Sequence, residues 1–509
     1  MLLVYWIYSD NVEWFIFVKV LKQEGLTGVE GISIPFVEER IEKIKTNIFL
    51  ITMEKTSLIF IIAALMSCFI IYFVFQDLSL SNFAFHFNFL VISLIVFTGI
   101  YCFGISSSIN NLFQPLHIYA FFYICIFFLT PCYMILAHEE DCHGVYIMDG
   151  CIFGTIYVII AFISFLCGYL RRQSNQVIEE PLEVPSETKI KRILTTSYIF
   201  FGIACALNLF LLISIGYNLN YLFTLGGDGL AKVTGIPDNL RFLFNSGYVL
   251  LVPWLFICAY GKKWHALVGA YLLFIIFYAY GWRFIIYIVA VAGAIVFYRT
   301  RNKQPKMSHI IIFGAVLFLY STIGGMMRGA MRSGENATVQ KVETDDFIYT
   351  LESNFDIYKT YYGVVQTYPS KEDFWYGQAI IASPIIMWIP RFIWPDKPLG
   401  TEYPLTIGIM KSCGNDAIKG AAMSSPNITE YYLDFGVFGI IIYSFILGVV
   451  CRRMLKLYYG KSLYGVIKYA LFCGFLIQLI NRGYMAQLVT LIVILYLPLL
   501  LYRKYYVTK

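Results

Sequence analysis

The residues GGMMRGAMR (324–332), IPRFIWPDKP (389–398) and SSPNITEYYLDFG (424–436) mark the one long polar segment of this chain, Gly324–Glu430. Long apolar stretches precede it and follow it. Connections longer than about 15 residues are uncommon within a domain, and most of them are functional. We therefore expect a set of membrane spans organised around this segment, with the function residing at or near it.

The composition indicates the broad class. The chain is 59% hydrophobic and only 14% charged, whereas soluble domains are about 25% charged. Apolar runs approach the length of about 20 residues that a membrane-spanning helix needs, and they are continuous rather than alternating. The sequence therefore predicts an all-α polytopic membrane protein.

We expect about 12 transmembrane helices in a single membrane domain, residues 53–509, with one long extracytoplasmic loop, 324–430, before the last three spans. The predicted spans lie near 57–75, 83–104, 115–136, 149–170, 193–215, 243–260, 266–282, 284–298, 308–323, 432–450, 466–480 and 485–502.

The lysines and arginines of the short connections predict the orientation. Most lie in one set of connections and in the C-terminal tail, whereas the opposite short connections hold only Lys232, Arg241, Arg283 and Arg482. Cations are retained on the cytoplasmic side. Both termini are therefore expected in the cytoplasm, and Gly324–Glu430 outside.

Residues 1–52 do not fit this pattern, because Asp10 and Glu13 interrupt their apolar run. We expect an N-terminal extension that is either a peripheral cytoplasmic appendage or untranslated, with Met53 as the start. No usual cleavable signal peptide begins at Met1.

Cofactor signatures are absent from the sequence. The chain has no GxxxxGK[ST] phosphate-binding loop, which argues against direct coupling to ATP. The cluster HEEDCH (138–143) contains metal-ligand types without a structural zinc spacing, so we interpret it as a solvated acidic loop. We expect no metal, no cofactor and no nucleic-acid partner.

The most informative residues are arginines near span ends on the side that holds few cations. They are Arg283, Arg328, Arg332, Arg391 and Arg482. Arg283 lies in AYGWRFIIY (279–287), and a charge at the bilayer centre costs at least about 2.5 kcal/mol. Snorkelling to the headgroups is the alternative for Arg283. A shared anionic ligand explains all five.

Arginine binds phosphate oxygens through two parallel hydrogen bonds. Polyprenyl pyrophosphates and phospholipids are the anionic lipids expected at that surface. If a glycosyl bond to a pyrophosphate breaks, fixed cations stabilise the charge that develops on the leaving group.

A transfer reaction also needs a group that takes the proton of the acceptor hydroxyl. Glu430 is the best placed, with Asp396 and Glu402 behind it, although Asp396 can instead pair with Lys397. The aromatics of the polar segment suit either sugar stacking or the ordinary interfacial belt. They are Tyr361, Tyr362, Tyr368, Phe374, Trp375, Tyr376, Trp388, Trp394 and Tyr403.

With GWRF at 281–284, the long polar segment, PRFIWPDKP and SPNITEYYLDFGVFG, the chain resembles the O-antigen or oligosaccharide repeat-unit polymerases, the Wzy-type membrane proteins. The resemblance covers most of the chain from about Met53. It implies that undecaprenyl-pyrophosphate-linked repeat units are joined at the outer face of the bacterial cytoplasmic membrane into O-antigen, capsule or exopolysaccharide. Membrane lipid, a chain-length regulator and a flippase of the same pathway are the other expected partners.

The resemblance directs attention to arginines of the outer loops. Our candidate catalytic residues are Arg283, Arg328, Arg391 and Glu430, and our candidate substrate-binding residues are Arg332, Arg482, Asp396, Lys397 and Trp394. The arrangement of an arginine, ten residues and a glycine that some members show is absent after both Arg283 and Arg391.

Two alternatives remain. An O-antigen ligase-like enzyme, which moves finished glycan onto another acceptor, would share the arginines. A flippase or transporter of lipid-linked sugars would show charged residues in mid-span and two similar halves, and neither is clear here.

Overall fold

The computed structural model describes residues 82–106, 112–136, 141–142, 145–171, 180–214, 247–279, 283–303, 357–389, 425–483 and 485–506, with a few single residues between them. The predicted extension 1–52 and the predicted span 57–75 lie outside the described residues. So do most of the span 308–323 and most of the segment 324–430.

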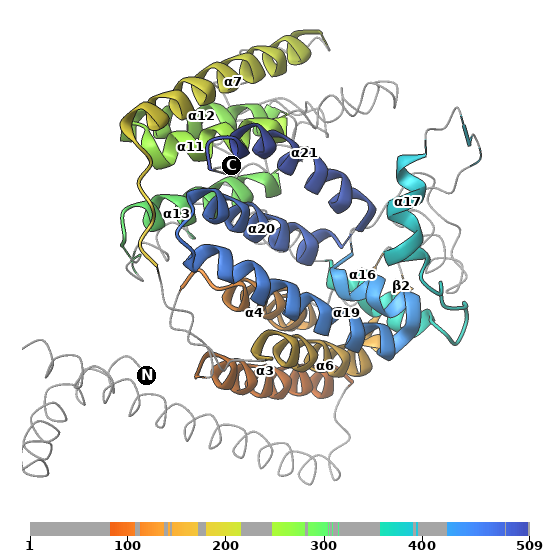
Figure 1. Cartoon of the computed structure of the whole chain (residues 1–509). Coiled ribbons are helices and arrows are strands. Elements are labelled where there is room, and N and C mark those ends of the chain that lie inside the picture. The colour runs from red at the N-terminus through yellow and green to blue at the C-terminus, as the bar shows by residue number, and fades with distance from the viewer. Residues whose placement is uncertain are drawn as a thin grey trace, which may run out of the picture. The chain divides into compact units, whose positions relative to one another are not determined.

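Helices make up almost all of the described chain (Figure 1). They are α3 (Asn82–Ser106), α4 (Pro115–Ile124), α5 (Thr130–Leu136), α6 (Cys151–Leu170), α7 (Glu187–Ser214), α11 (Leu251–Tyr260), α12 (Lys263–Ala279), α13 (Arg283–Thr300), α16 (Tyr358–Thr367), α17 (Ser383–Trp388), α19 (Asn427–Tyr459), α20 (Leu463–Arg482) and α21 (Met485–Arg503). A π-helical turn, Cys125–Leu129, joins α4 to α5. Two short antiparallel strands, β1 (Asp141–Cys142) and β2 (Val145–Tyr146), form a small hairpin.

The prediction of an all-α membrane protein is confirmed in its main point. Every predicted span that falls within the described residues coincides with a helix or with consecutive helices. Within the described residues, six helical segments are long and apolar enough to cross a membrane. The total of about 12 spans and the length of the polar loop stay predictions.

The helices run between two ends, which we name after one residue each. The Glu430 end contains the hairpin, the starts of α6, α13, α19 and α21, and the end of α20 (Figure 1). The Arg299 end contains the opposite ends of the same helices. Antiparallel packing of α13 on α20 fixes their register, because a Cβ added at Gly474 would lie 2.4 Å from the side chain of Ile288.

Arg299 ties three segments together at its end of the bundle. Its side chain is 3% exposed. Its Nε donates to the Tyr458 carbonyl at 2.9 Å and its Nη2 to the Glu180 carbonyl at 2.5 Å. A buried charge needs such partners, so Arg299 joins α13 to the end of α19 and to the segment before α7.

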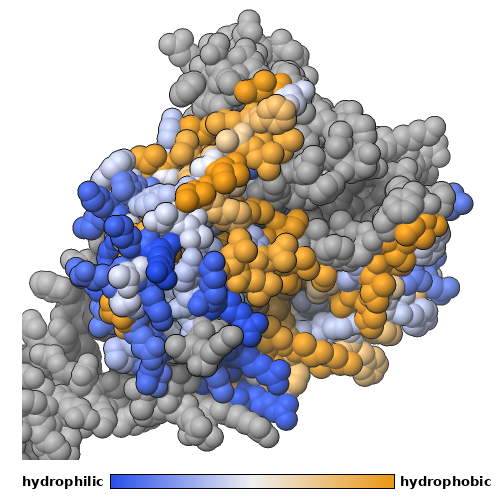
Figure 2. Space-filling view, turned by 45° about the horizontal axis from the view of Figure 1, so that its top comes forward, coloured by the Kyte–Doolittle hydropathy of each residue, from blue (hydrophilic) through white to orange (hydrophobic). Residues whose placement is uncertain are grey.

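Lysines and arginines gather at the Arg299 end. Figure 2 shows hydrophilic residues on one side of the molecule beside a broad apolar surface. The described cations at this end are Arg171, Lys189, Lys191, Arg192, Lys262, Lys263, Arg299, Arg301, Lys303, Arg452, Arg453, Lys456, Lys461, Lys468, Arg503 and Lys504.

The closest helix packing is that of α6 on α19. A Cβ at Gly168 would lie 2.1 Å from the Phe445 carbonyl oxygen, and one at Gly448 would lie 2.1 Å from the Phe165 carbonyl oxygen. Small residues let helix backbones approach closely in membranes. The contact fixes α19, which carries Glu430, on the rest of the bundle.

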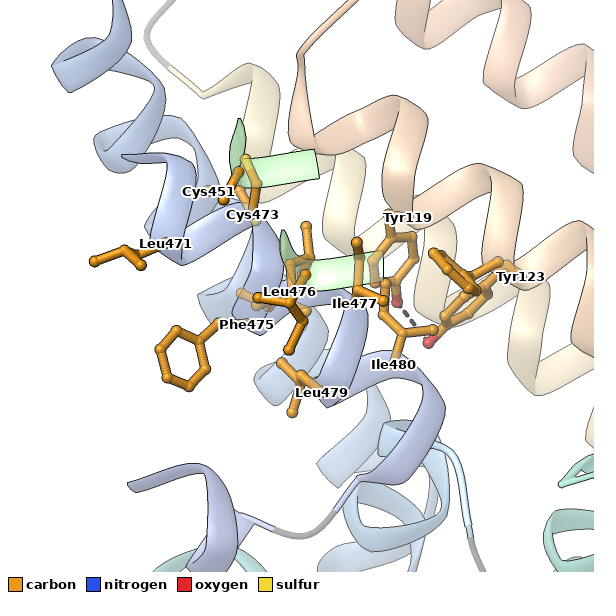
Figure 3. Close-up of a cluster of buried hydrophobic side chains, with 14 of the residues drawn as sticks. Tyr119, Tyr123, Cys451, Leu471, Cys473, Phe475, Leu476, Ile477, Leu479 and Ile480 are labelled. Carbon is orange, nitrogen blue, oxygen red and sulfur yellow. Dashed lines mark hydrogen bonds between the residues drawn. The ribbon is translucent and has the colours of Figure 1, made fainter. Parts of the chain in front are cut away.

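Aromatic side chains fill the space between α4, α6 and α20. Tyr119 of α4 stacks on Phe165 of α6 with ring centroids 4.2 Å apart. Figure 3 shows Ile477 and Ile480 of α20 beside Tyr119 and Tyr123. This core packs against the end of α20 and the start of α19.

Candidate active site

Helix α19 is broken near its start. Phe435 and Gly436 leave helical geometry, and Gly436 has φ +59° and ψ −140°, a conformation that favours glycine. A Cβ there would lie 2.9 Å from the Phe374 ring. The break divides α19 into a short first part that carries the candidate residue Glu430 and a long second part.

Backbone carbonyls next to the break bind the segment that precedes α17. At the break the Leu433 and Asp434 carbonyls accept hydrogen bonds from the Trp375 and Tyr376 N–H groups, at 2.8 and 3.0 Å. Trp375 and Tyr376 belong to the polar segment 324–430. Part of the segment is therefore held on α19 through its backbone.

Asp434 adds a second attachment. Its carboxylate accepts hydrogen bonds from the N–H groups of Ala379 at 2.9 Å and Ile380 at 3.0 Å, in the first turn of the helical segment Gln378–Trp388. A carboxylate is favourable at a helix N-terminus because the free N–H groups there carry partial positive charge. Sequence reasoning missed Asp434, although it stands four residues after Glu430 and therefore one helical turn away.

Glu430 performs the same task for a different helix. It is 1% exposed, and its Oε2 accepts a hydrogen bond of 3.2 Å from the N–H of Met485, the first residue of α21. The end of α20 at Gly483 thus lies against Ser425 and Pro426, since Gly483 at φ +59° would place a Cβ 2.8 Å from the Ser425 carbonyl oxygen and 3.1 Å from that of Pro426. The turn that contains Arg482 and the start of the SSPNITEYYLDFG stretch are therefore neighbours.

Arg482 lies in the same turn as Gly483, and its side chain is exposed. Arg283 is the first residue of α13. Since α13 and α20 are antiparallel, with Ile288 beside Gly474, Arg283 is level with the last turn of α20. The backbone therefore brings Arg283, Glu430 and Arg482 to one end of the bundle, although the side chain of Arg283 is outside the described part.

Of the other predicted site residues, the structure describes only Trp394 and Asp396. Trp394 is 39% exposed, and Asp396 is exposed. They follow α17, which packs against α21. Four predicted residues, Arg328, Arg332, Arg391 and Lys397, lie outside the described residues, as does Glu402.

The tyrosines of α16 are core residues and have no face free for a sugar. Tyr361 and Tyr362 are fully buried. The Tyr361 hydroxyl donates to the Gly154 carbonyl at 3.1 Å, and the Tyr362 hydroxyl pairs with that of Thr155 at 3.2 Å. Burial raises the pKa of both tyrosines, so both hydroxyls stay protonated. Tyr376, 70% exposed, keeps a free face in addition to Trp394.

A chain of hydrogen bonds fixes the first residue of α19. The Tyr119 hydroxyl donates to that of Tyr123 at 2.6 Å, and the Tyr123 hydroxyl donates to Oδ1 of Asn427 at 3.3 Å. All three side chains are buried. Sequence reasoning missed this contact, because nothing in the apolar run of α4 marks which tyrosines face α19.

Within the described residues, no group of three or more His, Cys, Asp or Glu side chains is arranged to hold a metal ion. Most of the acidic cluster 138–143 is outside them, with only Asp141 and Cys142 placed, on β1.

These features define a polytopic, all-helical integral membrane protein with two buried carboxylates and exposed polar groups at one end. The chain belongs to the O-antigen polysaccharide polymerase Wzy family, whose model matches residues 57–509. It is therefore a polysaccharide repeat-unit polymerase, a glycosyltransferase-type enzyme, and a multi-pass protein of the bacterial inner membrane. No significant match exists among curated proteins or solved structures.

Proposed function

We propose that the enzyme joins undecaprenyl-pyrophosphate-linked oligosaccharide repeat units at the outer face of the cytoplasmic membrane, with polyprenyl pyrophosphate as the leaving group. Family membership supports the reaction class. The observation that carries the site is that Arg283, Glu430 and Arg482 share the end opposite the cation-rich Arg299 end. Because cations mark the cytoplasmic side, the Glu430 end faces outward.

The step is a substitution at the anomeric carbon of the growing chain. A hydroxyl oxygen of the newest unit forms the new glycosidic bond, the bond from the anomeric carbon to pyrophosphate breaks, and the hydroxyl proton passes to a carboxylate. We assign the proton acceptor to Glu430, a carboxylate in the first turn of α19 at the same end of the bundle as Arg283 and Arg482. The pyrophosphate leaves with the bonding electron pair.

The arginines stabilise that departing charge. Arg283, Arg328 and Arg391 act on the leaving pyrophosphate, because guanidinium groups that meet charge developed only in the transition state lower the barrier selectively. Arg332, Arg482, Lys397, Asp396 and Trp394 hold the diphosphate and the adjoining sugars. This scheme requires no metal ion. A chain-length regulator and a flippase of the same pathway are its expected partners.

We expect Arg283→Ala to reduce long-chain polymer at least about 100-fold while the protein still inserts, because a lost transition-state donor costs about that much. The measurement is the polymer ladder of a deletion strain that expresses the variant. Arg301→Ala is the matched control, since Arg301 follows the opposite end of the same helix. Normal chain lengths in Arg283→Ala would remove this residue from the mechanism.

The deletion strain itself separates the activities. A polymerase defect leaves single repeat units on the acceptor lipid. Polymer retained on undecaprenol would indicate a ligase, and repeat units trapped at the inner leaflet would indicate a flippase. Either of the last two results would contradict the proposed reaction.

A further inference from the structure

One face of α20 carries a buried amide, Gln478, and a half-buried amide, Asn481, at the Glu430 end. Gly474, Gln478 and Asn481 are spaced i, i+4 and i+7, so they share a face of the helix. Gly474 meets Ile288, so this face packs on α13. Because the two helices are antiparallel, Gln478 and Asn481 are level with the first turn of α13, which begins at Arg283.

The amide oxygens on this face are unpaired. Gln478 is 2% exposed. Its Oε1 and the Oδ1 of Asn481 have no hydrogen-bond partner within the part of the chain that the structure describes. Native proteins pair the large majority of buried polar atoms, so two such oxygens on one helix face indicate that a ligand completes them.

The chemistry of these atoms selects the ligand. A carbonyl oxygen only accepts hydrogen bonds, and a fully ionised diphosphate has no proton to donate. Sugar hydroxyls and acetamido N–H groups do donate. The next residue, Arg482, is exposed and supplies a cation for the anionic part of the same molecule.

We infer that Gln478 and Asn481 bind hydroxyl or acetamido groups of a substrate sugar and thereby contribute to the choice of repeat unit. The inference rests on the proposed function, since it takes the lipid-linked saccharide as the ligand. It adds a sugar-recognising element on α20 to the arginines that hold the diphosphate.

The test uses Gln478→Met and Asn481→Leu in the full-length protein, each removing the unpaired oxygen at similar side-chain volume. Purified protein is assayed with lipid-linked repeat units. We expect KM to rise about tenfold or more with a smaller change in kcat, because ground-state and transition-state contacts are lost together. The thermal midpoint should stay the same or rise, because an unsatisfied buried group disappears.

Asn208→Leu is the matched control. Asn208 is a buried amide of α7 whose Nδ2 donates to the Ala204 carbonyl at 2.7 Å, and its loss should leave KM unchanged. Gln478→Glu keeps acceptor oxygens in place and should restore part of the affinity that Gln478→Met loses.

Two results would overturn the inference. Wild-type KM in both variants would show that no substrate group meets these oxygens. A lowered thermal midpoint in both would show that they pair with a group of the protein itself. Failure of the wild-type enzyme to polymerise would instead refute the proposed function, and the inference with it.

Discussion

Glu430 and Asp434 stand one turn apart on α19, and each receives backbone N–H groups from the start of another helical segment. Glu430 binds α21, and Asp434 binds the segment Gln378–Trp388. The first part of α19 therefore positions two other elements. Glu430, the proposed proton acceptor, therefore also holds the start of α21 in place.

We expect Asp434→Ala to lower the free energy of unfolding by on the order of 2 kcal/mol, because the N–H groups of Ala379 and Ile380 lose a charged acceptor. Asp434→Asn keeps one carbonyl oxygen, so its free energy of unfolding should fall between those of the wild type and Asp434→Ala. Thermal unfolding of detergent-purified protein measures both. Tyr443→Phe is the control. It removes only a long hydrogen bond, 3.5 Å from the Tyr443 hydroxyl to Asp434 Oδ2, so it should change the thermal midpoint less than Asp434→Ala does. Equal thermal midpoints for wild type and Asp434→Ala would refute the attachment.

Sequence could not have supplied these contacts. The residues DFG (434–436) suggest a break before an apolar span, but the partner of Asp434 lies 55 residues away, as does that of Glu430. Single-sequence patterns report on neighbours along a helix. They do not report on which loop reaches which helix end.

Among the elements, the apolar spans were predictable and their full lengths were not. α7 begins at Glu187 rather than near 193, and α19 extends from Asn427 to Tyr459 rather than over 432–450. The hydropathy of a span measures the thickness of the apolar layer. Helices continue beyond it through charged residues such as Lys189 and Lys456, which carry no apolar signal.

The break in α19 depends on a glycine at position 436. Gly436 combines φ +59° with a Phe374 ring 2.9 Å from where a Cβ would stand. We expect Gly436→Ala to destabilise the protein by about 1–3 kcal/mol through backbone strain alone, with polymer formation lost alongside.

Gly202→Ala is the matched control for this prediction. Gly202 lies in α7 with nothing within 4 Å of an added Cβ, and alanine in a helix interior is more stable than glycine by roughly 0.5–1 kcal/mol. Chemical unfolding of the two variants in the same detergent compares them. If Gly436→Ala proves as stable as Gly202→Ala, the break is not built on this glycine.

At the scale of the whole molecule, most described cations and the proposed site lie at opposite ends. The Arg299 end carries most of the described lysines and arginines, the distribution expected of a cytoplasmic side, and its most deeply buried described arginine, Arg299, is bound to backbone carbonyls. The arginines of the Glu430 end run against that distribution. Under the proposed function, a diphosphate at the outer surface is the ligand that accounts for them.

Labelling of single cysteines on spheroplasts by a membrane-impermeant thiol reagent tests this orientation most directly. Tyr376→Cys reports on the Glu430 end and Val184→Cys on the Arg299 end, since their parent residues are 70% and 82% exposed. The wild-type protein gives the background of native cysteines. We predict labelling of Tyr376→Cys without lysis and of Val184→Cys only after lysis. The reverse pattern would place the arginines of the Glu430 end in the cytoplasm and contradict the proposed site.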